Sequence, residues 1–151
     1  MYSLILTVHS WVRWIALVSV VGAALAALMG RVETERSPAD RWGLAAIMAL
    51  DIQMLLGLLL YLVVSPNMRP ILANFGAAMK DPALRFWAVE HTATMIAAIA
   101  AAHISRALAR KAQTLVAKRT RLMVGFSVAA LLIMLGMPWP GRPGGRPLFR
   151  I

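Results

Sequence analysis

Four long apolar runs constrain the fold of this 151-residue chain more than any other feature. They cover residues 4–29, 43–64, 86–108 and 122–137. The first three have the roughly 20 residues that an α-helix needs to cross a hydrocarbon core, and the fourth is at the low edge of that range. Backbone in lipid must satisfy its own hydrogen bonds, which favours helices. The sequence therefore predicts an all-α fold, a transmembrane four-helix up-down bundle.

The composition agrees with a membrane protein. Hydrophobic residues make up 60% of the chain and its mean hydropathy is +0.71, whereas a soluble domain is about 45–50% apolar. No soluble domain remains outside the runs, so we expect residues 1–151 to form a single integral membrane domain. The first run contains "AALAAL", which is typical of a signal-peptide cleavage site, but the basic start of a signal peptide is missing. We interpret this run as a retained helix.

The distribution of Lys and Arg predicts the orientation of the bundle. The loops after the first and third runs carry more basic residues than the opposite side does. The larger set comprises Arg31, Arg36, Arg41, Arg106, Arg110, Lys111, Lys118, Arg119 and Arg121. The smaller set comprises Arg69, Lys80, Arg85, Arg142, Arg146 and Arg150. Because cytoplasmic loops carry the excess of Lys and Arg, we expect a bacterial inner-membrane protein with both termini periplasmic.

The net charge of +10 also bears on the partners of the chain. In a membrane protein such an excess reflects topology and attraction to anionic lipid headgroups. The basic residues flank apolar runs and carry no nucleic-acid reader motif, so we expect no nucleic-acid binding. Lipids and other membrane subunits are the expected partners.

Two segments outside the runs have their own signals. "SPNMRPILANFGAAMKDP" predicts either a short interfacial helix over residues 70–80 or an ordered loop that caps the bundle. The interfacial helix would turn four apolar residues to the headgroups: Ile71, Leu72, Phe75 and Met79. "DPALR" is typical of an Asp81 N-cap followed by Pro at the first helical position. The third helix is thus expected over residues 83–108, with its start near Pro82.

The tail over residues 138–151, "PWPGRPGGRPLFRI", is too rich in Pro and Gly to be helical. We expect an extended basic arm that lies over lipid headgroups or over a neighbouring subunit. A solvated tail is the alternative.

Six ionisable side chains lie within or at the edges of the expected spans, where each is costly unless it is paired. They are His9, Arg13, Asp51, Glu90, His91 and His103. The first and third helices run in the same direction, so the rise of 1.5 Å per residue places His9 and His91 at similar depth. Arg13 is one turn from His9 on the same face, and Glu90 adjoins His91. The sequence therefore predicts an outer polar layer of these four residues.

Asp51 and His103 form a predicted inner layer, which we interpret as an interhelical clamp, with a role in a proton path as the alternative. Gln53 lies near this layer, but about 200° around the helix from Asp51.

Three interpretations of the outer layer remain open. His9 and His91 could be the metal ligands of one bis-histidine haem b, with Arg13 and Glu90 beside the cofactor. Small residues in "TMIAAIAAAH" and Gly57 would leave room for the macrocycle. The layer could instead be a structural clamp in which Arg13 pairs with Glu90. A quinone or proton-relay site is the third interpretation.

The chain resembles small bacterial four-helix membrane proteins loosely labelled cytochrome b-like. The resemblance is carried by "HSWVRW", "IQMLLGLLLYLVVSP", "MKDPALRFWAVEH" and "PWPGRPGGRPLFR", which together span most of the chain. It implies the same four residues for the outer site: His9, Arg13, Glu90 and His91. It also implies that relatives carry His at the position of Asp51, so that a ligand role there is lost in this chain.

Two classes of function follow from these patterns. The first is a b-type cytochrome-like protein that carries one haem for electron transfer within a membrane redox complex. The second is a non-catalytic accessory subunit of a larger respiratory or photosynthetic complex. No nucleophile–base set, phosphate loop or metal-binding spacing occurs in the sequence, so we expect no catalytic activity of its own.

Overall fold

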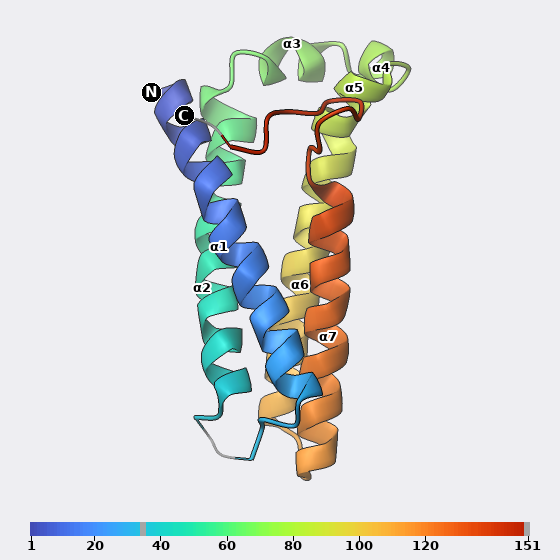
Figure 1. Ribbon diagram of the computed structural model, residues 1–151. Helices are drawn as coiled ribbons and strands as arrows, with labels where there is room; N and C mark the ends of the chain where they lie inside the picture. Colours follow the sequence, from blue (N-terminus) through green and yellow to red (C-terminus); the bar gives the residue numbers. More distant parts are fainter. Residues whose placement is uncertain (34–35, 150–151) are drawn as a thin grey trace.

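The computed structural model describes residues 1–33 and 36–149 (Figure 1), so Arg150 and the end of the predicted arm lie outside the described residues. The first two long helices are α1 (Tyr2–Leu28) and α2 (Pro38–Leu59), and α2 is extended by a wide π-helical segment, η1 (Leu60–Val64). Two short helices follow, α3 (Met68–Ala73) and α4 (Phe75–Ala78). The third long helix comprises α5 (Pro82–Arg85), a second π-helical segment η2 (Phe86–Glu90) and α6 (His91–Arg110). The fourth is α7 (Leu115–Gly136).

Four of these helical stretches are long and apolar enough to cross a membrane. They are Tyr2–Leu28, Pro38–Val64, Pro82–Arg110 and Leu115–Gly136, of 27, 27, 29 and 22 residues. They lie side by side along one long axis, and their connections alternate between its two ends (Figure 1). The all-α prediction with four spanning helices is therefore confirmed, and the chain is a multi-pass membrane protein.

Two helices begin before the apolar runs that predicted them. α2 starts at Pro38 rather than near residue 43, because Ser37 caps it by accepting a hydrogen bond from the backbone nitrogen of Asp40 at 3.3 Å. α7 starts at Leu115 rather than near residue 122, because Thr114 accepts from the backbone nitrogen of Ala117 at 3.1 Å. Hydropathy marks only the part of a helix that can sit in lipid, whereas the caps mark where the helix begins.

The half of the bundle near the α1–α2 and α6–α7 connections, which we call the inner half, is closely packed. Its core consists largely of buried alanines, and it includes the ring of Phe126, which is fully buried. Small residues allow helix backbones to approach closely in a membrane. Gly125 on α7 shows how close the approach is, since a Cβ atom there would collide with Ser105 on α6. Ala98 and Ala102 of α6 are fully buried in this core.

Charged side chains close the inner end of the bundle. Lys118 forms an ion pair with Asp40 at 2.7 Å. Arg119 donates to the carbonyl oxygens of Ala27 and Leu28 at 3.1 and 2.6 Å, which are the last carbonyls of α1. A helix C-terminus leaves such carbonyls unpaired, and cations there also interact favourably with the helix dipole. Part of the basic excess on this side therefore holds helix ends together.

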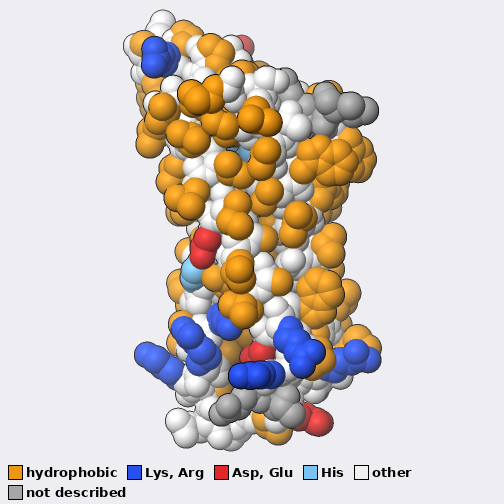
Figure 2. All heavy atoms as spheres, turned by 90° about the vertical axis from the view of Figure 1, so that its left-hand side faces the viewer, with side chains coloured by type: hydrophobic (Ala, Val, Ile, Leu, Met, Phe, Trp, Pro, Cys, Tyr) orange, Lys and Arg blue, Asp and Glu red, His pale blue; other side chains and the backbone are white. Residues whose placement is uncertain are grey.

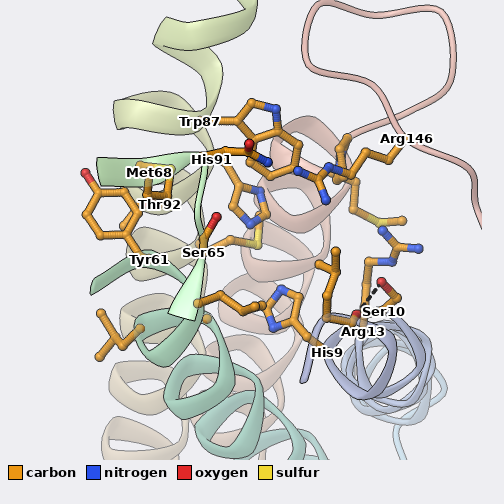
Figure 3. Close-up of a pocket in the computed structure, with 18 of the residues that line it drawn as sticks. His9, Ser10, Arg13, Tyr61, Ser65, Met68, Trp87, His91, Thr92 and Arg146 are labelled. Carbon is orange, nitrogen blue, oxygen red and sulfur yellow. Dashed lines mark hydrogen bonds between the residues drawn. The ribbon is translucent and has the colours of Figure 1, made fainter. Parts of the chain in front are cut away.

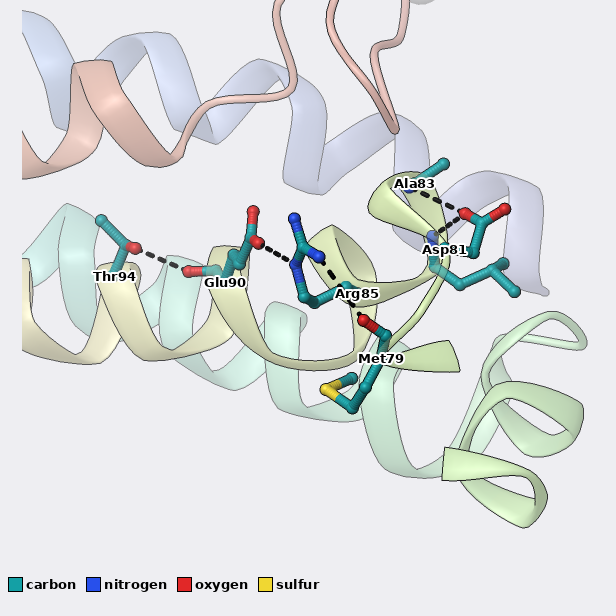
Figure 4. Close-up of polar contacts among 7 residues, drawn as sticks. Met79, Asp81, Ala83, Arg85, Glu90 and Thr94 are labelled. Carbon is teal, nitrogen blue, oxygen red and sulfur yellow. Dashed lines mark hydrogen bonds and ion pairs between the residues drawn. The ribbon is translucent and has the colours of Figure 1, made fainter. Parts of the chain in front are cut away.

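The opposite, outer end is covered by α3, α4 and the segment after α7, which crosses above the helices in Figure 1. α3 turns Met68 and Ile71 inward, at 6% and 8% exposure, whereas Leu72 and Phe75 remain exposed. The connection is therefore both helical and a cap, a combination of the two alternatives that the sequence left open. α5 starts at Pro82, and Asp81 accepts from the backbone nitrogens of Ala83 and Leu84 at 2.8 and 2.9 Å, which confirms the predicted N-cap (Figure 4).

Candidate functional site

A cavity of about 1080 Å³ lies in the outer half of the bundle, below α3 and the C-terminal segment. Ligand pockets in proteins usually enclose about 300–1,000 Å³, so this space can hold a molecule the size of a cofactor. Its wall is mostly apolar and comes from α1, α2, η1, α3, the third long helix and the segment after α7. His9, Arg13, His91 and Arg146 reach it among the polar side chains (Figure 3).

His91 is oriented by α7. Its Nδ1 lies 2.7 Å from the carbonyl oxygen of Gly136. A carbonyl oxygen only accepts, so Nδ1 carries the proton and the lone pair of the neutral ring is on Nε2. Nε2 makes no hydrogen bond to any described residue. Metal-binding histidines commonly have this arrangement, with one ring nitrogen donating to a carbonyl and the other free for the metal.

His9 is held from α2 by Gln53. The Gln53 Nε2 donates to the backbone oxygen of His9 at 3.0 Å and lies 3.2 Å from the Nε2 of the His9 ring. Because that amide nitrogen is a donor, the His9 Nε2 accepts and Nδ1 carries the proton. Two polar atoms are left buried and without a partner among the described residues, the Nδ1 of His9 and the Oε1 of Gln53.

The two imidazoles are neighbours. Their ring centres are 6.5 Å apart and their planes are inclined by 71°. Two imidazoles that share one metal ion through bonds of about 2 Å have ring centres roughly 6 Å apart. The common depth predicted for His9 and His91 is thus confirmed, and their separation is compatible with one shared metal ion.

Arg13 and Arg146 bring positive charge to the same wall. Arg13 donates from Nη2 to the carbonyl oxygen of Leu148 at 2.7 Å, and its Nε is buried without a partner among the described residues. The guanidinium of Arg146 lies 4.4 Å from the ring centre of Trp87, a cation–π contact. The cavity therefore combines an apolar body with two guanidinium groups, which suits a ligand that has an anionic part.

The C-terminal segment packs on its own bundle. Phe149 stacks on Trp14 with ring centres 5.4 Å apart and planes inclined by 19°, and it also lies 5.7 Å from Trp11. Trp14 donates to the carbonyl oxygen of Leu148 at 3.2 Å. The solvated tail is therefore wrong for residues 138–149, because aromatic and polar groups on α1 hold the segment. Its contact with lipid headgroups or a neighbouring subunit stays a prediction.

Glu90 is the predicted site residue that the structure does not bring to the cavity. It is exposed, does not line the wall, and pairs with Arg85 at 2.6 Å (Figure 4). The predicted pairing of Arg13 with Glu90 is thus wrong. Adjacent residues on a helix point about 100° apart, so His91 turned inward leaves Glu90 on the outer surface. The wide turn of η2 brings side chains five residues apart close together, so Arg85 becomes the partner of Glu90.

Both π-helical segments border the cavity. Tyr61 of η1 and Trp87 of η2 line its wall, and Tyr61 donates to the carbonyl oxygen of Ala88 at 2.6 Å. Single π-helical turns are frequent at functional sites. Hydrophobic periodicity carries no signal for them, so the sequence did not predict them.

The room for a ligand comes only in part from the residues that were expected to provide it. Gly57 accommodates the His9 ring, since a Cβ atom there would lie 3.3 Å from its Cε1. The third long helix lines the cavity with Met95, Ile96 and Ile99 rather than with its buried alanines. Gly57 therefore lines the cavity, as the sequence predicts, whereas the alanines of α6 do not.

Asp51 and His103 form the pair that their depth predicts. The Nε2 of His103 lies 2.8 Å from the Oδ1 of Asp51. This pair joins α2 to α6 and is not part of the cavity wall. Gln53, two residues along α2, belongs to the outer layer rather than the inner one, because it bonds to His9.

The sequence did not place Gln53, Arg146 or Phe149 in the outer site. Gln53 has no charge to mark it, and the other two lie in a segment without periodicity. The repeated Arg in "GRPGGRP" is the one signal that could have drawn attention to Arg146.

The fold and the cavity define a class of protein: a multi-pass membrane protein with a ligand-sized, largely apolar cavity at one end of its helices. Comparison with protein-family models, with curated proteins and with solved structures finds no match for the chain. A functional assignment therefore depends on the cavity itself.

Proposed function

We propose that the protein is a b-type cytochrome-like electron carrier that holds one haem b in the outer cavity. The observation that carries the proposal is the pair of imidazoles on the cavity wall, with ring centres 6.5 Å apart and the Nε2 of His91 free of hydrogen bonds to described residues. Bis-histidine ligation needs two such rings in an apolar space.

His91 and His9 have different parts in this proposal. His91 is oriented for ligation through Nε2 by its bond to Gly136. His9 becomes a ligand when the Gln53 amide leaves its Nε2. The cavity is large enough for the ring system, and Arg13 and Arg146 supply positive charge for the two propionates. Glu90 contributes only through its ion pair with Arg85, which supports the turn before His91.

The haem would supply one-electron transfer, and the apolar wall would exclude water from it. We place the protein in a bacterial inner membrane, within a membrane redox complex. The positive-inside rule favours periplasmic termini, which would put the cavity on the periplasmic side.

The test is an absorption spectrum of the purified protein after incubation with haem b. We expect a Soret band, and α and β bands that sharpen on reduction with dithionite. His91→Ala abolishes these bands. His103→Ala is the matched control, because that ring lies outside the cavity, and it leaves them unchanged. A wild-type protein without a Soret band would end the haem proposal.

A second candidate is favoured by a specific observation. Both imidazoles already make interhelical hydrogen bonds, His9 to α2 through Gln53 and His91 to α7 through Gly136. Such bonds fix helix register without any ligand. An accessory subunit of a larger respiratory or photosynthetic complex would need no more than this. It would show no haem spectrum and would migrate with a larger complex on a native gel.

A further inference from the structure

The Asp51–His103 pair lies on the outer surface of the membrane-spanning bundle. Its side chains are 51% and 46% exposed, although both belong to helices that are apolar enough to span a membrane. Figure 2 shows an acidic and a histidine side chain together at mid-height, surrounded by apolar side chains and separate from the Lys and Arg that gather near one end. An ion pair is therefore turned toward lipid.

Hydrogen bonding within the chain satisfies only half of this pair. The Nε2 of His103 bonds to the Oδ1 of Asp51, and neither the Oδ2 of Asp51 nor the Nδ1 of His103 bonds to a described residue. The hydrocarbon core offers no water to replace such bonds. Polar groups at this depth are usually turned to the bundle interior or paired with another helix. The pair thus needs a polar partner from outside the described chain.

We propose that this partner is the same pair in a second copy of the chain, related by a twofold axis along the membrane normal. Such an axis brings the same surface of both copies together, so that residue 51 of one can meet residue 103 of the other. The axis also keeps the two Asp51–His103 pairs at the same depth in the membrane. A different protein would need its own polar groups at that depth. This inference does not depend on haem binding.

The donors and acceptors complement one another. Each pair, with His103 protonated and Asp51 ionised, is neutral and has one free donor, Nδ1–H, and one free acceptor, Oδ2. In the dimer each Oδ2 accepts from the partner's imidazole, which closes a ring of four hydrogen bonds. No charge is left unpaired in lipid.

The neighbouring residues form a seam suited to helix packing. On α2, exposed apolar side chains flank Asp51 at alternating spacings of three and four residues, namely Leu44, Met48, Leu55 and Leu58. This is the spacing of helices that pack side by side along their length. On α6, Ala100 is exposed one turn before His103, and small residues allow a second helix to come close.

Cysteine cross-linking in native membranes tests the proposal cleanly, because the chain has no Cys of its own. Met48→Cys and Leu55→Cys are each treated with a short bis-maleimide, and the product mass is measured. We expect a homodimer from at least one of them. Leu131→Cys, at 64% exposure on α7, is the matched control and should give none.

A further, combined variant shows whether the polar pair drives association. Met48→Cys combined with Asp51→Leu and His103→Leu should lose the cross-linked homodimer at least tenfold, while circular dichroism shows the helix content unchanged. Absence of cross-links at both seam positions would overturn the proposal. So would equal cross-linking at Leu131→Cys, adducts with a different protein, or a homodimer that persists in the apolar double variant.

Discussion

The two halves of the bundle consist of the same four helices, but one half is closely packed and the other contains a cavity. The inner half is filled by alanines and Phe126 and is closed by Lys118, Arg119 and their partners. The outer half keeps a cavity of about 1080 Å³ and is closed by short helices and an irregular segment. Its polar atoms are also less well paired, since His9, Arg13 and Gln53 each keep one unpartnered buried atom among the described residues. The inner half is therefore packed for stability, whereas the outer half leaves space that a ligand could fill.

The largest expected effect on stability comes from removing a buried side chain from the inner half. Phe126→Ala should lower the free energy of unfolding by about 3–5 kcal/mol, because the ring is fully buried among close-packed helices. Thermal unfolding in detergent, followed by circular dichroism, measures the loss. Phe75→Ala removes a ring that is 46% exposed at the outer end and serves as the control. Equal losses of unfolding free energy in the two variants would contradict the difference in packing between the inner half and the outer half.

A matched pair of leucines compares the halves directly. Leu122→Ala, at 1% exposure in the inner core, should cost about 2–5 kcal/mol. Leu6→Ala, at 8% exposure on the cavity wall, should cost clearly less, because its side chain already borders open space. Urea unfolding of both variants in the same detergent provides the comparison. A larger loss for Leu6→Ala would mean that the cavity wall, and not the inner core, holds the helices together.

The aromatic closure of the outer end should be weaker. Phe149→Ala removes a ring stacked on Trp14 and should destabilise the C-terminal segment by about 0.5–1.5 kcal/mol. Hydrogen exchange of the backbone amides over residues 138–149 should accelerate roughly tenfold, the change that corresponds to about 1.4 kcal/mol. Amides of α7 in the inner half report whether the effect is local, and they should exchange at the wild-type rate.

The most specific effect is expected at Gln53, where the loss of stability should not exceed that at Phe149. Gln53→Leu removes the donor from the Nε2 of His9 and should cost about 1 kcal/mol of stability. If His9 is a haem ligand, the same change should tighten haem binding severalfold in a spectroscopic titration, because no amide competes for that nitrogen. Weaker binding would show that Gln53 positions His9 instead.

Much of the fold follows from periodicity and depth. The apolar runs predict the four spans, and the depth count brings His9 to His91 and Asp51 to His103. The depth of a residue does not determine the direction in which its side chain points. Depth predicts Glu90 beside Arg13, whereas η2 turns Glu90 outward to Arg85.

Gln53 shows a second reason for a missed contact. It follows Asp51 by two residues, so a depth count assigns both to one layer, yet about 200° of rotation turns them to different neighbours. The partners of the C-terminal segment could not be predicted either, because a chain without periodicity gives no face to match against α1.

The cavity wall joins parts of the chain that are synthesised far apart in time. Arg13 and Leu148, which close it together, are 135 residues apart. At about 5–20 residues per second, translation separates them by on the order of 10 s. Until Leu148 and Phe149 have been made and have folded back on α1, the outer end of the bundle stays open on that side. If the cavity holds the proposed haem, this bulky ligand can enter during membrane insertion and be enclosed afterwards, so loading would be a step in the biogenesis of the protein.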